Sequence, residues 1–314
     1  MTSSTFPRTS SAVSKEKRVL AIVGPTASGK TALAVKVAQR LDGEIVGTDS
    51  MQAYRGMDIG TATPTADERG GVAHHMIDCW SVDQEVTVAE FQQQARACID
   101  DSLARRKTPV VTGGSGLYVS AVLDDLRFPG TDQRVRERLE READEIGAQA
   151  MHDRLAEVDP AAAAVILPTN TRRIVRALEV NEITSGNFAA SLPDPVDVYS
   201  TIRFGLDIPR DELDDRIERR VDAMFEAGFP DEVAKLNQGG GIGRTAAMAL
   251  GYPQVLAALH GECSMEQARQ STIDLTRKFA RRQQRWFRRD ARITWIPYDA
   301  SDAVDRVVRG FHGT

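Results

Sequence analysis

Short apolar runs and helical apolar spacing alternate along the first third of the chain. Residues 19–23 are uniformly apolar and stop at a Gly-Pro pair, the pattern of a strand buried on both faces of a parallel sheet. Apolar residues then recur at every fourth position from Leu33, as on one face of a helix. Residues 44–48 and 109–112 predict two more strands, and a capping box at 87–90 predicts the start of another helix. This alternation predicts an α/β fold with a doubly wound parallel sheet.

The pattern changes after about residue 128. Helical spacing without a convincing strand covers residues 132–147, 148–158 and 171–185, with Pro160 and Pro168 as separators. Strand-like alternation returns at 198–206, and from there the chain is predicted to be helical as far as a last strand at 293–296. We therefore predict an all-helical insertion domain within an α/β core, with boundaries of 128–195 for the insertion and of 18–127 and 196–314 for the core.

Length and composition are those of a globular protein. The chain has 314 residues, of which 41% are hydrophobic and 27% charged, so it can bury a core without a disulfide or a structural metal. Residues 1–17 are rich in Ser and Thr and lack periodicity, which predicts a disordered tail. No apolar run reaches the roughly 18 residues of a membrane-spanning helix. Three dispersed cysteines are typical of a reduced protein, and we expect a cytoplasmic one that does not act in a membrane.

The net charge of −5 hides a basic segment. Residues 269–292 alone have a net charge of +7, so the remainder of the chain carries −12. A local basic stripe on an acidic protein can bind a polyanion, although it can also be a solvated helix face anchored by its aromatic residues. We call the following residues the basic stripe: Arg277, Lys278, Arg281, Arg282, Arg285, Arg288 and Arg289.

The strongest chemical signal is a glycine-rich motif at residues 24–31. It reads Gly-Pro-Thr-Ala-Ser-Gly-Lys-Thr and fits the phosphate-loop pattern, with a predicted strand before it and a predicted helix after it. Backbone N–H groups at such a helix N-terminus form an anion-binding concavity, Lys30 adds a positive charge, and the Thr31 hydroxyl is placed to hold Mg²⁺. The motif predicts binding of a di- or triphosphate, including nucleotides such as ATP, by Gly24, Pro25, Thr26, Ala27, Ser28, Gly29, Lys30 and Thr31. It does not say which reaction follows.

A carboxylate is missing where most phosphate-loop hydrolases place one. The strand at 109–112 continues into Gly-Gly, and the nearest acid at a strand end is Asp49, after the second strand. Because the ligand crevice of an open α/β sheet lies outside the carboxyl ends of its strands, Asp49 is expected beside the phosphate loop. The alternative is that Asp49 only caps a turn or helix.

Arg220 is predicted to point inward. Its helix, about 212–228, has an apolar stripe formed by Leu213, Ile217, Val221 and Met224. Arg220 lies three residues after Ile217 and four before Met224, so it points with that stripe. A buried arginine needs an ionic partner or a ligand anion, so Arg220 is either a structural ion-pair residue or part of an anion site.

The order and spacing of the motifs resemble those of the tRNA dimethylallyltransferases, in their bacterial form. The resemblance covers most of the chain, from about residue 19 to about residue 297. It is carried by residues 24–31, 48–52, 54–62, 74–78, 113–118, 172–179, 216–220, 251–252 and 281–287.

The resemblance implies a reaction and a set of partners. Members of that family transfer a dimethylallyl group from dimethylallyl diphosphate to the exocyclic amine of the adenosine on the 3′ side of the anticodon, tRNA position 37, and release diphosphate. The resemblance further implies a phosphate-loop core, Mg²⁺ as cofactor, a monomer, and a helical insertion that grips the tRNA anticodon stem-loop. From the residues alone, a phosphate-loop kinase of a nucleotide or small metabolite, and a non-catalytic RNA-binding switch, stay as alternatives.

The resemblance also implies roles for single residues. Asp49 falls on the family's general base, Thr26 on a contact near the bridging oxygen, and Arg220 on a diphosphate contact. Residues beside the flipped-out adenine would be Asp49, Ser50, Met51 and Gln52, and Ser115 would also contact tRNA. Arginines that are otherwise read as solvated helix faces would contact tRNA in the insertion, namely Arg136, Arg172, Arg173 and Arg176.

Overall fold

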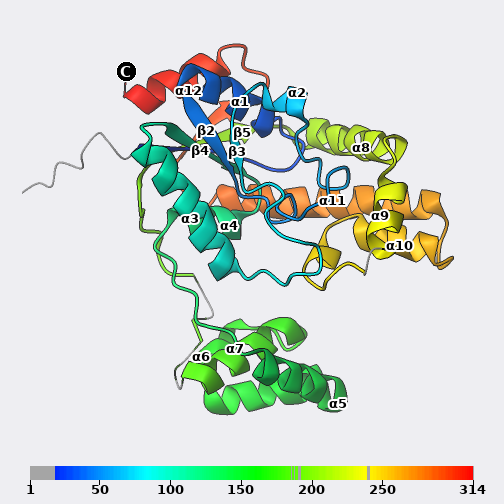
Figure 1. Cartoon of the computed structure of the whole chain (residues 1–314). Helices are drawn as coiled ribbons and strands as arrows, with labels where there is room; N and C mark the ends of the chain where they lie inside the picture. The colour runs from blue at the N-terminus through cyan, green and yellow to red at the C-terminus, as the bar shows by residue number, and fades with distance from the viewer. Residues whose placement is uncertain (1–17, 185, 187, 190–191, 239–240, 314) are drawn as a thin grey trace, which may run out of the picture. The chain divides into compact units, whose positions relative to one another are not determined.

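The chain folds as two compact units, which Figure 1 shows in a computed structural model. The structure describes residues 18–313 except 185, 187, 190–191 and 239–240, so the predicted tail lies outside the described residues. One unit is Asp125–Val196, where the sequence analysis placed the insertion at 128–195. The other unit contains the chain before and after it, and each unit is described by itself below.

The larger unit is built on a six-stranded parallel sheet with the order β3-β2-β4-β1-β5-β6. The strands are β1 (Arg18–Val23), β2 (Gly43–Gly47), β3 (His74–His75), β4 (Thr108–Gly113), β5 (Ser200–Asp207) and β6 (Ile293–Pro297). The predicted strands are confirmed to within two residues at their ends. The edge strand β3 was not predicted, because two residues are too few to establish a period.

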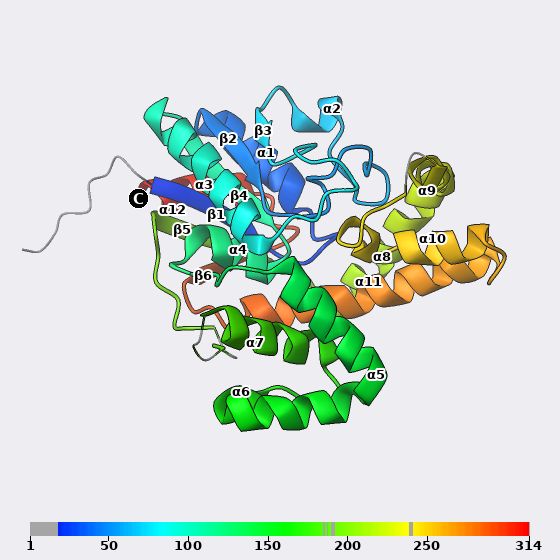
Figure 2. The same ribbon diagram turned by 60° about the horizontal axis from the view of Figure 1, so that its bottom comes forward.

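Helices cover both faces of the sheet, as the two views in Figures 1 and 2 show. Side chains of α1 (Lys30–Arg40) and α12 (Ala303–His312) pack with Leu20 and Ile22 of β1 on one face. Side chains of α3 (Val88–Ala104) and α4 (Gly116–Leu123) pack with Val19 and Val23 on the other. The capping box predicted at the start of α3 is confirmed. Two buried faces on one central strand explain its uninterrupted apolar sequence.

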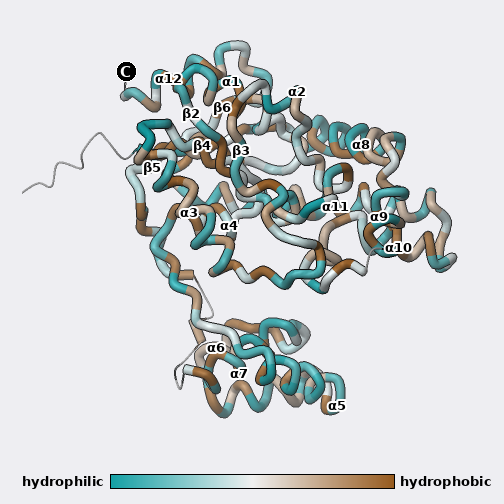
Figure 3. Tube along the Cα trace, in the orientation of Figure 1, coloured by the Kyte–Doolittle hydropathy of each residue, from teal (hydrophilic) through white to brown (hydrophobic). Residues whose placement is uncertain are grey.

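A layer of further helices extends from the end of the sheet. It consists of α8 (Arg210–Glu226), α9 (Phe229–Gln238), α10 (Tyr252–Leu259) and α11 (Met265–Phe287). Outside this layer, the single helical turn α2 (Ala66–Arg69) contacts α1. Figure 3 shows the alternation of polar and apolar turns along α8, whose predicted stripe Leu213, Ile217 and Val221 is buried. Within the described residues, no helix is both long enough and apolar enough to cross a membrane.

The smaller unit is entirely helical in its described residues. It contains α5 (Gln133–Val158), α6 (Pro160–Val165) and α7 (Thr171–Thr184) around a core that includes Leu139, Leu155 and Ile174. The predicted break after residue 147 is confirmed, because Gly147 interrupts α5 with a φ of 83°. Pro160, predicted to separate two helices, does follow the end of α5, but the short helix α6 was not predicted. Pro160 occupies the first turn of α6 and Asp159 caps it, since proline lacks only an N–H that a helix start leaves unpaired.

Two arginines hold the point at which the chain leaves and re-enters the larger unit. Asp124 and Asp197 face each other in an antiparallel bridge. Arg203, whose side chain is 3% exposed, and Arg292 each bind both carboxylates, with Arg292 Nη1 2.8 Å from Asp124 and 2.9 Å from Asp197. The two ends of the insertion are therefore fixed side by side.

A buried carboxylate organises the smaller unit. Glu179 of α7 has no exposed surface, and it accepts hydrogen bonds from Arg136, from Arg176 and from the backbone N–H of Asp132, at 2.8 to 3.1 Å. Both of its oxygens face only donors. The two arginines therefore stabilise the unit itself, whatever else they bind.

We predict that Glu179→Gln destabilises the smaller unit by about 3 kcal/mol, because an amide turns one acceptor into a donor among buried donors. Hydrogen exchange on the full chain should show faster exchange in α5 and α7 and unchanged exchange in the sheet. The matched control is Glu182→Gln, which removes a partly exposed ion pair with Arg138 and should cost less than about 1 kcal/mol. Equal effects of the two changes would contradict the prediction.

Candidate active site

The phosphate loop lies between β1 and α1, as predicted. Ala27 and Gly29 have φ values of 61° and 92°, so the loop turns through left-handed conformations before the first turn of α1. The Lys30 ammonium donates to the Pro25 carbonyl at 3.1 Å. The Thr26 N–H donates to the side-chain oxygen of Gln283 at 2.9 Å, so α11 fixes the loop from outside.

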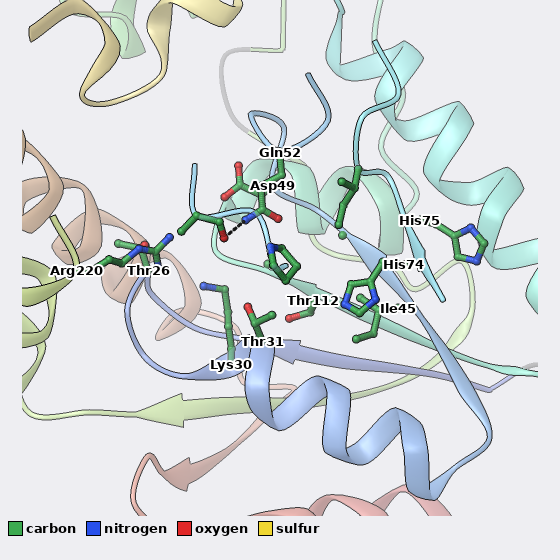
Figure 4. Close-up of a pocket in the computed structure, with 15 residues that line it drawn as sticks. Thr26, Lys30, Thr31, Ile45, Asp49, Gln52, His74, His75, Thr112 and Arg220 are labelled. Carbon is green, nitrogen blue, oxygen red and sulfur yellow. Dashed lines mark hydrogen bonds between the residues drawn. The ribbon is translucent and has the colours of Figure 1, made fainter. Parts of the chain in front are cut away.

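A small pocket, with a cavity volume of about 50 Å³ and partly open to solvent, lies at the carboxyl ends of the strands. Its lining combines the phosphate loop, the segments after β2 and β3, and α8. The polar lining residues are Thr26, Lys30, Thr31, Asp49, Gln52, His74, His75, Thr112 and Arg220. Figure 4 shows Lys30 and Asp49 pointing into the same space, with Arg220 beside Thr26 and the His75 ring turned away. The prediction that Asp49 lies beside the phosphate loop is confirmed.

The electrostatics of this pocket favour an anion. Burial, reinforced by the nearby positive charge of Arg220 and opposed by Asp49, lowers the pKa of Lys30 from its ordinary 10.5 to about 8. Burial also lowers the pKa of Arg220, again against the attraction of Asp49. Two cations held close together with one carboxylate leave an excess of positive charge. A bound phosphate group would relieve that excess.

Arg220 makes a weak contact with protein and forms no ion pair with any described carboxylate within 4.0 Å. Its Nη2 lies 3.4 Å from the Thr61 carbonyl. Of the two roles that the sequence left open, the structural ion pair is thus not observed among the described residues. The position of Arg220 in the pocket lining favours the anion site.

Asp49 has two functions in one side chain. Its Oδ1 accepts from the Met51 N–H at 3.0 Å, so it shapes the turn after β2 as the simpler interpretation predicted. Its carboxylate also lines the pocket. Gln52, further along the same turn, donates to the carbonyls of Thr61 and Ala62 at 3.1 and 3.2 Å.

Several predicted site residues lie outside the pocket lining. Ser50 is buried behind the turn, Met51 packs in an apolar cluster with Tyr54, and Ser115 stands before the first turn of α4. The four arginines predicted to contact tRNA belong to the smaller unit. Two of them bind Glu179, and the other two, Arg172 and Arg173, are exposed on α7.

Five residues of the basic stripe lie on α11, Arg288 and Arg289 follow its last residue, and part of the stripe is neutralised by acids. Arg277 pairs with Glu218 and Arg281 with Asp214, at 2.7 and 3.6 Å, which ties α11 to α8. Arg288 pairs with Asp207 and lies over the ring of Trp295. Among the residues that the structure describes, no carboxylate pairs with the remaining cations of the stripe, which are Lys278, Arg282, Arg285 and Arg289. These are exposed.

Sequence reasoning missed two polar contributors. Gln283 was given no role of its own, yet it is buried and leaves no room for a side chain at Gly114, where a Cβ would lie 2.5 Å from its amide nitrogen. His74 directs Nδ1 to the Val72 carbonyl at 2.9 Å. Its Nε2 and the Thr112 hydroxyl are buried without a partner in the described part of the chain, and both residues line the pocket. Buried polar atoms of this kind indicate a place for ligand or water.

The fold and the pocket together define a phosphate-loop α/β protein with a cationic site beside a strand-end carboxylate. The sequence model of the family described as IPP transferase matches residues 52–290. Because that match covers more than half of the chain, the chain belongs to the IPP transferase family.

Individual relatives support this assignment along nearly the whole length. A tRNA dimethylallyltransferase of Thermobifida fusca is 57% identical over 294 residues, which are 92% of this chain and 92% of the relative. One of Streptomyces avermitilis is 56% identical and is covered to 93%. The crystal structure of a tRNA isopentenylpyrophosphate transferase of Bacillus halodurans is 40% identical, with a TM-score of 0.71 over 95% of this chain and 96% of that one.

We predict that Lys30→Met raises the free energy of unfolding near pH 7, by up to about 3 kcal/mol, because folding no longer buries an ammonium beside Arg220. The pKa of Lys30 is lowered by folding, so the unfolded wild type binds more protons between about pH 8 and 10.5, and its stability rises over that window. The gain from the substitution should therefore shrink as the pH rises.

Urea unfolding at about pH 7 and about pH 9.5 measures this difference. Lys36→Met removes an exposed lysine from the same helix and should change stability little at either pH. A gain for Lys30→Met that is equal at both pH values would show that burial of the charge is not its cause.

Proposed function

We propose that this protein transfers a dimethylallyl group from dimethylallyl diphosphate to the exocyclic amine of the adenosine at tRNA position 37 and releases diphosphate. The names of the relatives support the reaction class. The observation that carries the proposal is that Lys30, Asp49 and Arg220 line one pocket. Such a pocket offers cations to a leaving group and a carboxylate to a nucleophile. The alternative, a phosphate-loop kinase of a nucleotide or small metabolite, is not favoured by these relatives.

The phosphate loop would hold the diphosphate. When the allylic C–O bond breaks, negative charge grows on the departing oxygen and spreads over the diphosphate. Loop N–H groups, Lys30 and Arg220 would stabilise this charge where it develops, which accelerates the chemical step. Thr26, which lines the pocket, would contact the diphosphate near its bridging oxygen.

Mg²⁺ fits the same end of the pocket. The Thr31 side chain lines the pocket beside Lys30, and the hydroxyl of Thr112 is available there as a second oxygen. Mg²⁺ prefers oxygen ligands and commonly shares them with phosphate and water. The ion would supply further neutralisation of the diphosphate charge.

Asp49 would act as the general base. The adenine amine is a weak acid at rest and becomes acidic as its nitrogen acquires the new carbon bond. One carboxylate oxygen of Asp49 is occupied by the Met51 N–H, which fixes the orientation of the other. That second oxygen can accept the amine proton at the moment of bond formation. Gln52, in the same turn, would contact the extruded base.

We assign the anticodon stem-loop to the smaller unit and to the exposed part of the basic stripe. The exposed Arg172 and Arg173 of α7 are suited to backbone phosphates. Arg136 and Arg176, which bind Glu179, would contribute positive charge, although Arg176 also donates to the carbonyls of Pro129 and Gly130. Ser115 would contribute from the start of α4. Because all the side chains of the proposed reaction come from one chain, we propose that a monomer is sufficient for activity.

Incubation of unmodified tRNA with the protein, Mg²⁺ and dimethylallyl diphosphate tests the proposal. Mass analysis of the nucleosides should show one adenosine that carries a five-carbon unsaturated group, with an equal amount of diphosphate released and without any ATP. If a parallel incubation with added ATP consumes the ATP while tRNA stays unmodified, the kinase is the correct function.

We predict that Asp49→Asn lowers turnover by about 10²- to 10⁴-fold, because the amide cannot accept the proton. tRNA binding should change little, since the affinity resides largely in phosphate contacts. Single-turnover kinetics and a filter-binding titration measure the two quantities separately. Asp67→Asn removes an exposed carboxylate from α2 and serves as the matched control. Near-normal turnover of the Asp49 variant would exclude Asp49 as the base.

A further inference from the structure

Outside the pocket, Glu232 in the first turn of α9 makes an unusual set of contacts. Its carboxylate accepts three consecutive backbone N–H groups, from Asp58 at 2.9 Å, Ile59 at 2.7 Å and Gly60 at 3.1 Å. It also accepts the hydroxyl of Tyr252 at 2.7 Å. Four hydrogen bonds to one ionised group form a strong anchor, because charge-assisted bonds are about twice as strong as neutral ones.

The anchored segment is packed so tightly that its position is defined. Gly60 lies against the rings of Phe229 and Tyr252, and a Cβ at that position would come within 2.2 Å of a Phe229 ring atom and 2.7 Å of a Tyr252 ring atom. The two rings contact each other edge to face, with centroids 5.0 Å apart. The Thr61 hydroxyl also bonds to the Met57 carbonyl, which closes the turn. Residues 57–62 therefore form a loop held by α9 and α10, and we call it the anchored loop.

The other side of the anchored loop faces the pocket. The Thr61 carbonyl accepts from Gln52 at 3.1 Å and from Arg220 at 3.4 Å, and the Ala62 carbonyl accepts from Gln52 at 3.2 Å. Both donors line the pocket together with Lys30. A continuous series of contacts therefore leads from Glu232, through three N–H groups and two carbonyls, to the side chains that would meet the diphosphate and the adenine.

We propose that Glu232, supported by Tyr252, is a positioning residue for the reaction: it sets Arg220 and Gln52 through the anchored loop without touching a substrate. This inference rests on the proposed function. The role requires a carboxylate, because one oxygen faces the N–H groups of Asp58 and Ile59, and the other faces Gly60 N–H and the Tyr252 hydroxyl. Glutamine in either orientation places its NH₂ group against donors.

The test compares Glu232→Gln with Asp231→Asn, which removes an exposed carboxylate from the adjacent position of the same turn. For Glu232→Gln we expect kcat to fall by about 10- to 100-fold, as displacements of about 1 Å at a reacting centre do. The dissociation constant for tRNA should stay within about threefold of the wild type. Asp231→Asn should match the wild type in both. Tyr252→Phe keeps the ring packing and removes one of the four bonds, so its loss of kcat should be smaller than about tenfold.

Two readouts separate positioning from general loss of stability. Hydrogen exchange should accelerate at the amides of residues 58–60 in Glu232→Gln while the sheet keeps its protection. In a multiple-mutant cycle, Glu232→Gln should cost less than about threefold when Arg220 and Gln52 have both already been replaced by Ala, because its effect passes through those two side chains.

The outcomes separate the inference from the function on which it rests. Turnover of Glu232→Gln equal to that of the wild type, or a full additional loss when Arg220 and Gln52 are both already Ala, would overturn the positioning role and leave the proposed function intact. A wild-type protein without any prenyl transfer would instead remove the proposed function, whatever the exchange data show.

Discussion

The structure depends on holding two positive side chains together at the carboxyl ends of a parallel sheet. Lys30 and Arg220 come from the two separate segments of the chain that build the larger unit, and the charge of Arg220 helps to lower the pKa of Lys30. Asp49 opposes this repulsion only in part. Folding has already brought the two cations together, so the site is preorganised. An anion that binds there would not need to supply the free energy of assembling them.

Side chains from outside the pocket make that arrangement possible. Gln283 of α11 binds the phosphate loop, and Glu232 of α9 binds the anchored loop. Both are acceptors that meet backbone N–H groups, so each defines the position of main chain rather than of a single side chain. A rigid main chain on both sides of a pocket keeps the distances between its charged groups constant, and such preorganisation is the principal source of electrostatic catalysis.

The pattern of hydrophobic and polar residues predicted those parts of the fold that are determined by residues close together in the sequence. The apolar run of β1, the phosphate loop and the inward direction of Arg220 follow from strand and helix periods, and Asp49 follows from its place at a strand end. Gln283 and Glu232 were beyond reach, because their partners lie more than 170 residues away in the sequence. A polar residue has the same local appearance whether it meets solvent or a distant backbone group. Family resemblance, and not periodicity, supplied the proposed substrates.

Arg203 and Arg292 join the two points at which the chain leaves and re-enters the larger unit, so the helical unit is a self-contained insertion. Its two connections start from facing residues, Asp124 and Asp197, that are already paired with each other. A chain without the helical unit would need only a tight turn to join Asp124 to Asp197, and no strand of the sheet would have to move. Lineages could therefore exchange, enlarge or lose the helical unit while the sheet and its pocket persisted.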